Sequence, residues 1–348
     1  MDTRDTPEQA ELRRAARQLA GSLGPTSVGD LDDGDRRARL RRAVTDAGWF
    51  ELRSIGDNGT PLASGVEVCI VAEALGTAVA DVELAGPLLA SDLARRAGVA
   101  IDPTTVVAFD AGLVDPVVIT QPANAPSYAV DAPRDGAHNA LVLVAADSGW
   151  SLATVPVDAP VDGTDLTRVV ARVTDDVPAT TIEGQERLLG PDDLTSWRAL
   201  GLALGSADLV GAMRGVIDVS VAYASERQQY GVPIGSFQAV QHLLAEAQVL
   251  LEGSVSITTY ATWAVDALPP DEALEAAAAA KAYSTRAART VCETAIQVHG
   301  GIGNTWECIV HVYLRRALLS SQWFGDDGVQ LRHLEQARLG VGAVDGLS

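Results

Sequence analysis

The stretch S-E-R-Q-Q-Y-G at residues 225–231, followed by P-I-G-S-F-Q at residues 233–238, is the most informative part of this 348-residue sequence. Local structure explains much of it, since Arg227 complements the dipole at a helix end, Gly231 stops that helix and Ser236 caps the next one. A binding role is the alternative, because a planar and always charged guanidinium can hold a phosphate group of a cofactor. The residues that would contact the rest of that cofactor are Gln229, Tyr230, Phe237 and Gln238.

A second glycine-rich stretch, Q-V-H-G-G-I-G at residues 297–303, ends the long helical segment that follows an alanine run at residues 276–280. A helix stop needs only one of these glycines, so it does not explain the others. Extra glycines at Gly300 and Gly301, beside the amide of Gln297, indicate that a ligand approaches the backbone closely. The diphosphate or adenosine of a dinucleotide is a natural candidate for that ligand.

The hydrophobic period divides the chain into three zones. It is helical at both ends, and in the middle it gives way to β-branched runs at residues 117–120 and 141–144, separated by Pro, Gly, Asp and Asn. We therefore predict an α+β protein with an N-terminal helical domain, a reduced middle β domain and a C-terminal helical domain. The expected boundaries are 1–104, 105–190 and 191–348. No G-x-G-x-x-G follows a predicted strand, so a Rossmann cofactor site is not supported.

Composition excludes several classes of function. Lys plus Arg is 26 against 46 for Asp plus Glu, a net charge of -20, and we recognise no basic patch in the sequence, so a nucleic-acid partner is not expected. The cysteines and histidines lack the spacing of a metal site. The N-terminus lacks a signal-peptide layout, and charges interrupt the apolar stretch at residues 199–221. We expect a cytoplasmic protein without a metal or a membrane span.

In this order, with a long helical stretch between them, the two glycine-containing motifs resemble the acyl-CoA dehydrogenase family. The N-terminal zone supports the resemblance with D-A-G-W-F at residues 46–50 and A-E-A-L-G at residues 72–76, and the C-terminal zone supports it with Y-L-R-R-A at residues 313–317. The middle zone is recognisable only faintly. The resemblance implies a helical domain, a β domain and a C-terminal four-helix bundle domain, with FAD bound across a subunit interface.

The resemblance also implies which residues bind the cofactor. In such enzymes the E-R-x-x-[FY]-G and Q-x-x-G-G stretches serve an FAD that is held mainly by the neighbouring subunit. Carried over residue by residue, the FAD-binding residues are Arg227, Gln229, Tyr230, Phe237, Gln238, Gln297, Gly300 and Gly301.

The sequence departs from the family at the catalytic base. The reaction that the resemblance implies removes a proton α to a thioester while hydride leaves the β carbon for the flavin, and a carboxylate must reach that proton. Phe324 stands where the commonest members carry this glutamate. Other members place it on an earlier helix, near Gly201 here, and Asp208 lies about two turns further on. Asp326 and Asp327 are the nearest acids to Phe324, and their plain interpretation is a solvated turn.

The β domain departs from the family as well. Members that hold their own flavin carry T-E-P-x-A-G-S-D and W-[IV]-[TS], whereas this chain has T-Q-P-A-N-A-P at residues 120–126 and W-S-L at residues 150–152, which has the look of a strand. The adenosine and diphosphate side of a flavin site is therefore kept, while the ring side and the base are lost.

Three hypotheses follow. The first is a non-catalytic subunit of an α2β2 acyl-CoA dehydrogenase of fatty acid or steroid side-chain catabolism. A related partner would carry the catalytic glutamate, act on an acyl-CoA substrate and pass electrons to an acceptor such as an electron-transfer flavoprotein. The second is an autonomous homo-oligomeric flavoenzyme whose base is Asp326 or Asp327. The third is a flavin-free scaffold protein that uses the fold for dimerisation.

Overall fold

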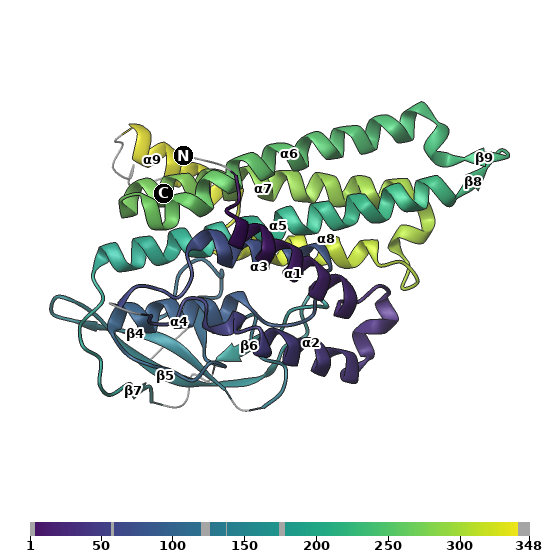
Figure 1. Ribbon diagram of the computed structural model, residues 1–348. Helices are drawn as coiled ribbons and strands as arrows, with labels where there is room; N and C mark the ends of the chain where they lie inside the picture. Colours follow the sequence, from purple (N-terminus) through teal and green to yellow (C-terminus); the bar gives the residue numbers. More distant parts are fainter. Residues whose placement is uncertain (1–3, 57–58, 120–125, 137, 174–177, 340–348) are drawn as a thin grey trace, which may run out of the picture.

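The computed structural model describes residues 4–56, 59–119, 126–136, 138–173 and 178–339 (Figure 1). The two ends of the chain form helices and its middle part forms a sheet, which confirms the predicted α+β class. The N-terminal helices are α1 (Pro7–Leu23), α2 (Gly34–Asp46), α3 (Gly65–Thr77) and α4 (Ala85–Ala97). Capping boxes start α1 at Thr6 and α3 at Ser64, because each cap side chain and the Gln or Glu three residues on satisfy each other's backbone N–H.

The sheet has seven strands in the order β2-β4-β1-β3-β6-β5-β7, and β4 also pairs with β5. Five strands therefore close into a ring, which removes the exposed edges that an open sheet would leave. The run at residues 141–144 and the W-S-L stretch fall in strands, and residues 118 and 119 of the run at 117–120 form a strand as well. The bounds are β1 (Val106–Phe109), β2 (Val118–Ile119), β3 (Tyr128–Val130), β4 (Asn139–Ala146), β5 (Gly149–Pro160), β6 (Val170–Val173) and β7 (Thr180–Thr181).

The C-terminal helices form a bundle whose long members run side by side (Figure 1). Their bounds are α5 (Pro191–Glu226), α6 (Gln238–Ala267), α7 (Pro270–His299), α8 (Val310–Gln322) and α9 (Asp327–Leu339). Helix α7 begins at the Pro-Pro-Asp-Glu stretch, where proline and carboxylates suit a first turn. Its alanines at 277, 278 and 280 are fully buried, so neighbouring helices approach it closely.

Helix α5 is the centre of the molecule. By length and hydropathy it is the one helix in the described ranges that could cross a membrane, but 94% of its most apolar window is buried inside the protein. It crosses α3 in backbone contact: a Cβ on Gly211 would lie 2.1 Å from the Glu73 carbonyl oxygen, and a Cβ on Gly76 would lie 2.6 Å from the Asp208 carbonyl oxygen. Glycine is required at this crossing because any side chain would separate the two helices.

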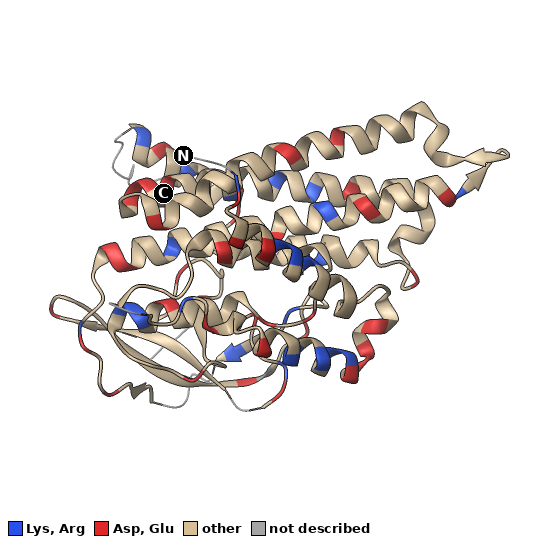
Figure 2. Cartoon of the chain, viewed as in Figure 1, with Lys and Arg blue, Asp and Glu red and all other residues tan. Residues whose placement is uncertain are grey.

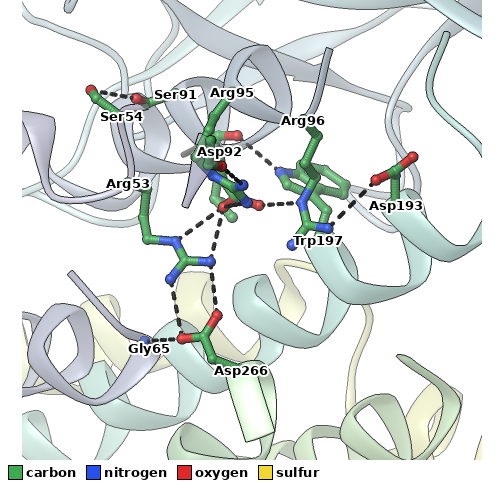
Figure 3. Close-up of polar contacts among 12 residues, drawn as sticks. Arg53, Ser54, Gly65, Ser91, Asp92, Arg95, Arg96, Asp193, Trp197 and Asp266 are labelled. Atoms are coloured by element: carbon green, nitrogen blue, oxygen red, sulfur yellow. Dashed lines mark hydrogen bonds and ion pairs between the residues drawn. The ribbon is translucent and has the colours of Figure 1, made fainter. Parts of the chain in front are cut away.

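Two buried ionic clusters connect the N-terminal helices, the sheet and the C-terminal bundle. In the first, Arg53 bonds Asp92 of α4 at 3.0 Å and Asp266 of α6 at 3.2 Å (Figure 3). In the second, Asp208 of α5 pairs with Arg168, at 2.7 Å, and with Arg316 of α8, at 2.8 Å. Arg168 belongs to the segment that leads into β6, so this second cluster joins the sheet to the bundle.

Lys281 of α7 is the only lysine in the sequence and is completely buried. Its Nζ donates to the carbonyl oxygens of Ser320, at 2.7 Å, and Trp323, at 2.6 Å, at the end of α8. Burial lowers the pKa of Lys281 to about 7. The side chain therefore satisfies helix-end carbonyls that would otherwise lie buried without a donor.

This lysine predicts a pH-dependent stability. Between pH 7 and 10 the unfolded chain keeps a proton on Lys281 that the folded chain has lost, so its contribution to the free energy of unfolding should rise by about 1.4 kcal/mol per pH unit. Lys281→Met lacks this contribution. Urea unfolding of both proteins at pH 7, 8 and 9 should give a steeper rise for the wild type. Parallel pH profiles would show that Lys281 does not release its proton on folding.

Candidate cofactor-binding site

The segment after α5 is a hairpin of β8 (Gln228–Gln229) and β9 (Val232–Pro233), which projects from the end of the bundle (Figure 1). Tyr230 and Gly231 form its turn, with φ of 52° and 79°. Such left-handed pairs suit two-residue hairpin turns. The expectation that Gly231 stops a helix is therefore wrong, because α5 already ends at Glu226, where Arg227 turns extended.

Ser236 also differs from its expected role. It does not cap α6, which has Phe237 at its N-cap without a side-chain hydrogen bond. Instead the Ser236 hydroxyl donates to the Pro233 carbonyl oxygen at 2.7 Å and closes a short 3-10 turn, Ile234–Ser236. The local sequence S-F-Q suits either role, and the preceding hairpin decides between them.

The hairpin, the start of α6 and the end of α7 enclose a cleft of about 540 Å³. Six of the eight predicted cofactor-binding residues line it: Arg227, Gln229, Tyr230, Phe237, Gly300 and Gly301. Gln238, the first residue of α6, and Gln297, in the last turn of α7, are not among the lining residues. The structure thus brings together two motifs that lie about seventy residues apart in the sequence.

The cleft has room and charge for an anionic ligand. The exposed side chain of Arg227 has no ion pair or hydrogen bond with any residue that the structure describes. A Cβ added to Gly300 or Gly301 would meet no atom within 4 Å, so the protein's own packing does not fill this space. Gly300 needs glycine for its φ of 65°, whereas Gly301 has no such requirement. An open backbone beside a free guanidinium fits the diphosphate of a dinucleotide.

Tyr223 and His299 also line the cleft, although sequence reasoning did not assign them to it. Their rings stack at a centroid distance of 4.2 Å, and His299 Nδ1 lies 2.9 Å from the Ala295 carbonyl oxygen. Burial lowers the pKa of His299, so the imidazole is neutral near pH 7. A signal was present, since Tyr223 lies one helical turn before Arg227 and His299 lies inside the Q-x-x-G-G motif.

Several of the apolar side chains that line the cleft are exposed. Tyr230 is 93% exposed, and Phe237 and Ile302 are each more than a third exposed. A cluster of exposed apolar residues on a soluble protein marks an interaction surface. The cleft is therefore open on the side where another protein chain could cover it.

The two sequence positions considered for a catalytic base face each other in the core. A Cβ on Gly201 of α5 would lie 2.3 Å from the ring of Phe324, so the ring occupies the space beside this glycine. Phe324 belongs to a buried aromatic cluster with Phe109, Trp197 and Trp323, whose ring centroids lie 5.1, 5.2 and 5.8 Å from its own. Neither position supplies a carboxylate, and apolar rings fill the space between them.

The backbone at Phe324 is held in an unusual conformation. Its φ is 65°, which is rare for a bulky residue and costs about 1–3 kcal/mol. Its N–H donates to the Leu113 carbonyl oxygen at 2.7 Å, and the Gln330 amide donates to its carbonyl oxygen at 2.8 Å. These contacts hold the ring in the aromatic cluster.

The remaining acidic candidates have structural partners. Asp326 is half-buried and accepts a hydrogen bond from the Val329 N–H at 2.9 Å, which caps α9. Asp327 pairs with Arg286 at 2.5 Å. Asp208 is buried in its ionic cluster, where burial raises its pKa but the guanidinium groups of Arg168 and Arg316 outweigh that effect and lower it. A catalytic role for Asp326 or Asp327 stays a hypothesis. Of the T-Q-P-A-N-A-P stretch that replaces a flavin-binding motif of the family, residues 120–125 lie outside the described ranges.

Comparison with known proteins decides the family. Residues 202–339 match the family model described as acyl-CoA dehydrogenase, C-terminal domain. The acyl-CoA dehydrogenase IpdE2 of Mycobacterium tuberculosis is 30% identical over 338 residues, which cover 94% of this chain and 97% of that protein. The chain belongs to the acyl-CoA dehydrogenase family.

Other acyl-CoA dehydrogenases are longer than this chain. FadE34 of M. tuberculosis is 37% identical over 282 residues, but these residues cover 76% of this chain and 37% of FadE34. Among solved structures, the steroid ACAD Tcur3481-Tcur3483 G363A variant superposes with a TM-score of 0.76, 21% identity and coverage of 96% and 98% of the two chains. The ChsE4-ChsE5 complex from M. tuberculosis superposes with a TM-score of 0.74 and 23% identity, and the match covers 99% of this chain and 100% of that chain. These two likenesses show the acyl-CoA dehydrogenase fold.

Proposed function

We propose that this chain is a non-catalytic subunit of an FAD-dependent acyl-CoA dehydrogenase and completes the FAD site of a catalytic partner. One observation carries the proposal: the cofactor cleft is open beside an unpaired Arg227, while the Phe ring at position 324 fills the space beside Gly201. Family membership supports FAD as the cofactor. The residues fit the adenosine and diphosphate part of FAD, and the aromatic cluster does not fit a site for proton removal.

Each part of the cleft has a distinct role in this proposal. Arg227 would bind the diphosphate, and the exposed backbone at Gly300 and Gly301 would let it approach. The stacked rings of Tyr223 and His299 would form one wall, and Tyr230 on the exposed hairpin would reach toward the partner. FAD supplies the hydride acceptor when it is bound. The carboxylate that removes the proton would come from the partner, because this chain has Phe324 at that position.

The partner and substrate are proposed from the relatives. One structural neighbour is titled a steroid ACAD, and another is a complex of two differently named chains. These titles support an assembly with a related subunit, for which we propose the stoichiometry α2β2 and an acyl-CoA substrate whose acyl group is a steroid side chain. An electron-transfer flavoprotein is the proposed acceptor, and the cytoplasm is the proposed location.

The test is to purify the chain alone and together with a candidate partner, a related acyl-CoA dehydrogenase of the same organism that carries the catalytic glutamate, and to measure FAD released per chain. We expect a colourless single chain and a yellow complex with one FAD per pair. One FAD bound by each copy of the isolated chain would reject the subunit role. A colourless chain that ignores the partner would instead favour a scaffold.

Arg227→Ala tests the cofactor cleft directly. The variant complex should bind FAD at least about tenfold more weakly, because a charge-assisted bond to phosphate is lost. Arg227 has no partner within the described residues, so the chain should still fold. Arg39→Ala is the matched control, since Arg39 is an exposed arginine on α2, outside the cleft. Equal FAD retention by both variants would remove Arg227 from the site.

A further inference from the structure

Helix α2 concentrates positive charge on a strongly acidic protein. Five of the 26 basic residues lie within seven positions of this helix, at 36, 37, 39, 41 and 42, whereas the net charge of the chain is -20. Figure 2 shows them as blue segments along α2. Asp32, Asp33 and Asp35 directly precede these arginines in the sequence, so the segment as a whole is not basic and the expectation of no nucleic-acid partner stays a prediction. The arginines matter here because several of them line one crevice together with residues from other parts of the chain.

Part of α2 forms one wall of a crevice of about 600 Å³. The other walls come from the turn between β3 and β4, from the segment before α4 and from Thr104, two residues before β1. The charged or titratable residues that line the crevice are Arg37, Arg41, Arg42, Asp81, Glu83, Arg134, Asp135 and His138. None of these residues lines the cofactor cleft, so the crevice is a separate feature.

Two of the three carboxylates in the crevice are already paired. Asp81 is held by the buried Arg36 through contacts of 2.8 and 2.5 Å. Glu83 accepts from Arg41 at 2.5 Å. These pairs neutralise the acidic wall and leave the remaining guanidinium groups without a carboxylate partner.

Three arginines of the crevice keep uncompensated charge. Arg42 and Arg134 make no side-chain hydrogen bond or ion pair in the described part of the chain, and Arg37 donates to the Leu31 carbonyl oxygen. Among the acids that line the crevice, only Asp135 is not paired with an arginine as described above. Burial lowers the pKa of His138, and the charge of Arg41 lowers it further, which agrees with a positive environment.

We propose that this crevice is a binding site for a diphosphate group. Guanidinium groups bind phosphate oxygens in a bidentate manner, and a concave site of several hundred Å³ is typical of small ligands. An ordinary solvated helix face would not explain Arg134, which comes from the turn after β3, 92 residues after Arg42, and lines the same crevice. A nucleoside diphosphate and coenzyme A both carry this group.

Calorimetric titration of the full chain with inorganic pyrophosphate tests the site, at low ionic strength and again at 0.15 M salt. Arg42→Ala and Arg134→Ala should each weaken binding by about tenfold or more. Arg39→Ala removes the same charge from the same helix outside the crevice and should change binding less than about twofold. All three residues are exposed and lack partners among described residues, so the variants should fold, which circular dichroism checks.

The outcomes separate the alternatives. Equal weakening by all three variants would show diffuse attraction and overturn the site, as would the absence of binding at millimolar pyrophosphate. Binding of an acidic peptide but not of pyrophosphate would also overturn it, in favour of a protein partner. If pyrophosphate binds, ADP and coenzyme A titrations identify the source by which competes more strongly. The measurement needs neither FAD nor the partner, and it is repeated with the Arg227→Ala variant, so that pyrophosphate bound at the cofactor cleft is not counted. Binding that Arg227→Ala abolishes, and that Arg42→Ala and Arg134→Ala leave unchanged, would place pyrophosphate in the cofactor cleft and overturn the crevice site.

Discussion

Asp208→Ala should lower the free energy of unfolding by about 3–5 kcal/mol, because it leaves buried charges without a partner. The Asp208 carboxylate accepts from Arg168, Arg316 and Ser320 at 2.7 to 3.0 Å. All of these residues are less than a tenth exposed. Without Asp208, the two guanidinium groups would face each other in the core, and the contact between the sheet and the bundle would loosen.

Two further variants separate the causes. Asp208→Asn keeps the volume and should still lose most of this stability, since an amide cannot neutralise two guanidinium groups. Asp218→Ala changes an exposed acid on the same helix and should stay within about 0.5 kcal/mol of wild type. Urea unfolding at pH 7 measures all three. A wild-type midpoint for Asp208→Asn would show that packing, and not charge, makes Asp208 important.

The same carboxylate predicts the direction of acid sensitivity. The pKa of Asp208 in the folded protein lies below the ordinary value for an aspartate, so its contribution to the free energy of unfolding is fully present at any pH above that ordinary value. This contribution is lost as the pH falls through the folded pKa. The difference in the free energy of unfolding between wild type and Asp208→Ala should therefore become smaller in strong acid.

The contact between Phe324 and Gly201 predicts a non-additive pair of substitutions. Phe324→Ala should cost about 3–5 kcal/mol through a buried cavity, and Gly201→Ala about 1–3 kcal/mol through overpacking, since the new Cβ would lie 2.3 Å from the ring. With the ring removed, that methyl group gains room. The double variant should therefore be more stable than the sum of the single changes by about 1–3 kcal/mol.

Gly205→Ala is the matched control for this cycle. It lies one turn further along α5, and the nearest atom to an added Cβ is Lys281 Nζ at 3.8 Å, an ordinary contact. Because alanine favours a helix over glycine by about 1 kcal/mol, this variant should be neutral or more stable. Strict additivity of Gly201→Ala and Phe324→Ala in denaturant unfolding would show that the ring does not pack on Gly201.

Periodicity and turn residues were sufficient to predict the helical ends and the middle sheet, whereas the cofactor-binding role of the two motifs came from the resemblance to the acyl-CoA dehydrogenase family. The same resemblance identified position 324 and the neighbourhood of Gly201 as the two base positions. It could not show that they face each other, because only the packing of α5 against the loop after α8 brings them together. Likewise, Arg42 and Arg134 share a crevice only because the turn after β3 lies beside α2.

Local signals were ambiguous where two structures use the same residues. Gly231 suits a helix stop or a hairpin turn, and the pairing of β8 with β9 selected the turn. Gln238 and Gln297 belong to the right motifs, but a motif specifies chain position and not which side chain faces the cleft. Tyr223 would have been found by stepping back one helical turn from Arg227.

The backbone contact between α3 and α5 also bears on synthesis of the chain. Gly211 follows Gly76 by 135 residues, so the ribosome needs roughly 7–27 s to make α5 after α3, at about 5–20 residues per second. During that interval α3, whose side chains Val68, Val71 and Leu75 are buried in the finished fold, lacks the helix α5 on which it packs. A nascent chain of this protein therefore carries an unfinished core for much of its translation, and this is the period in which a chaperone would protect it.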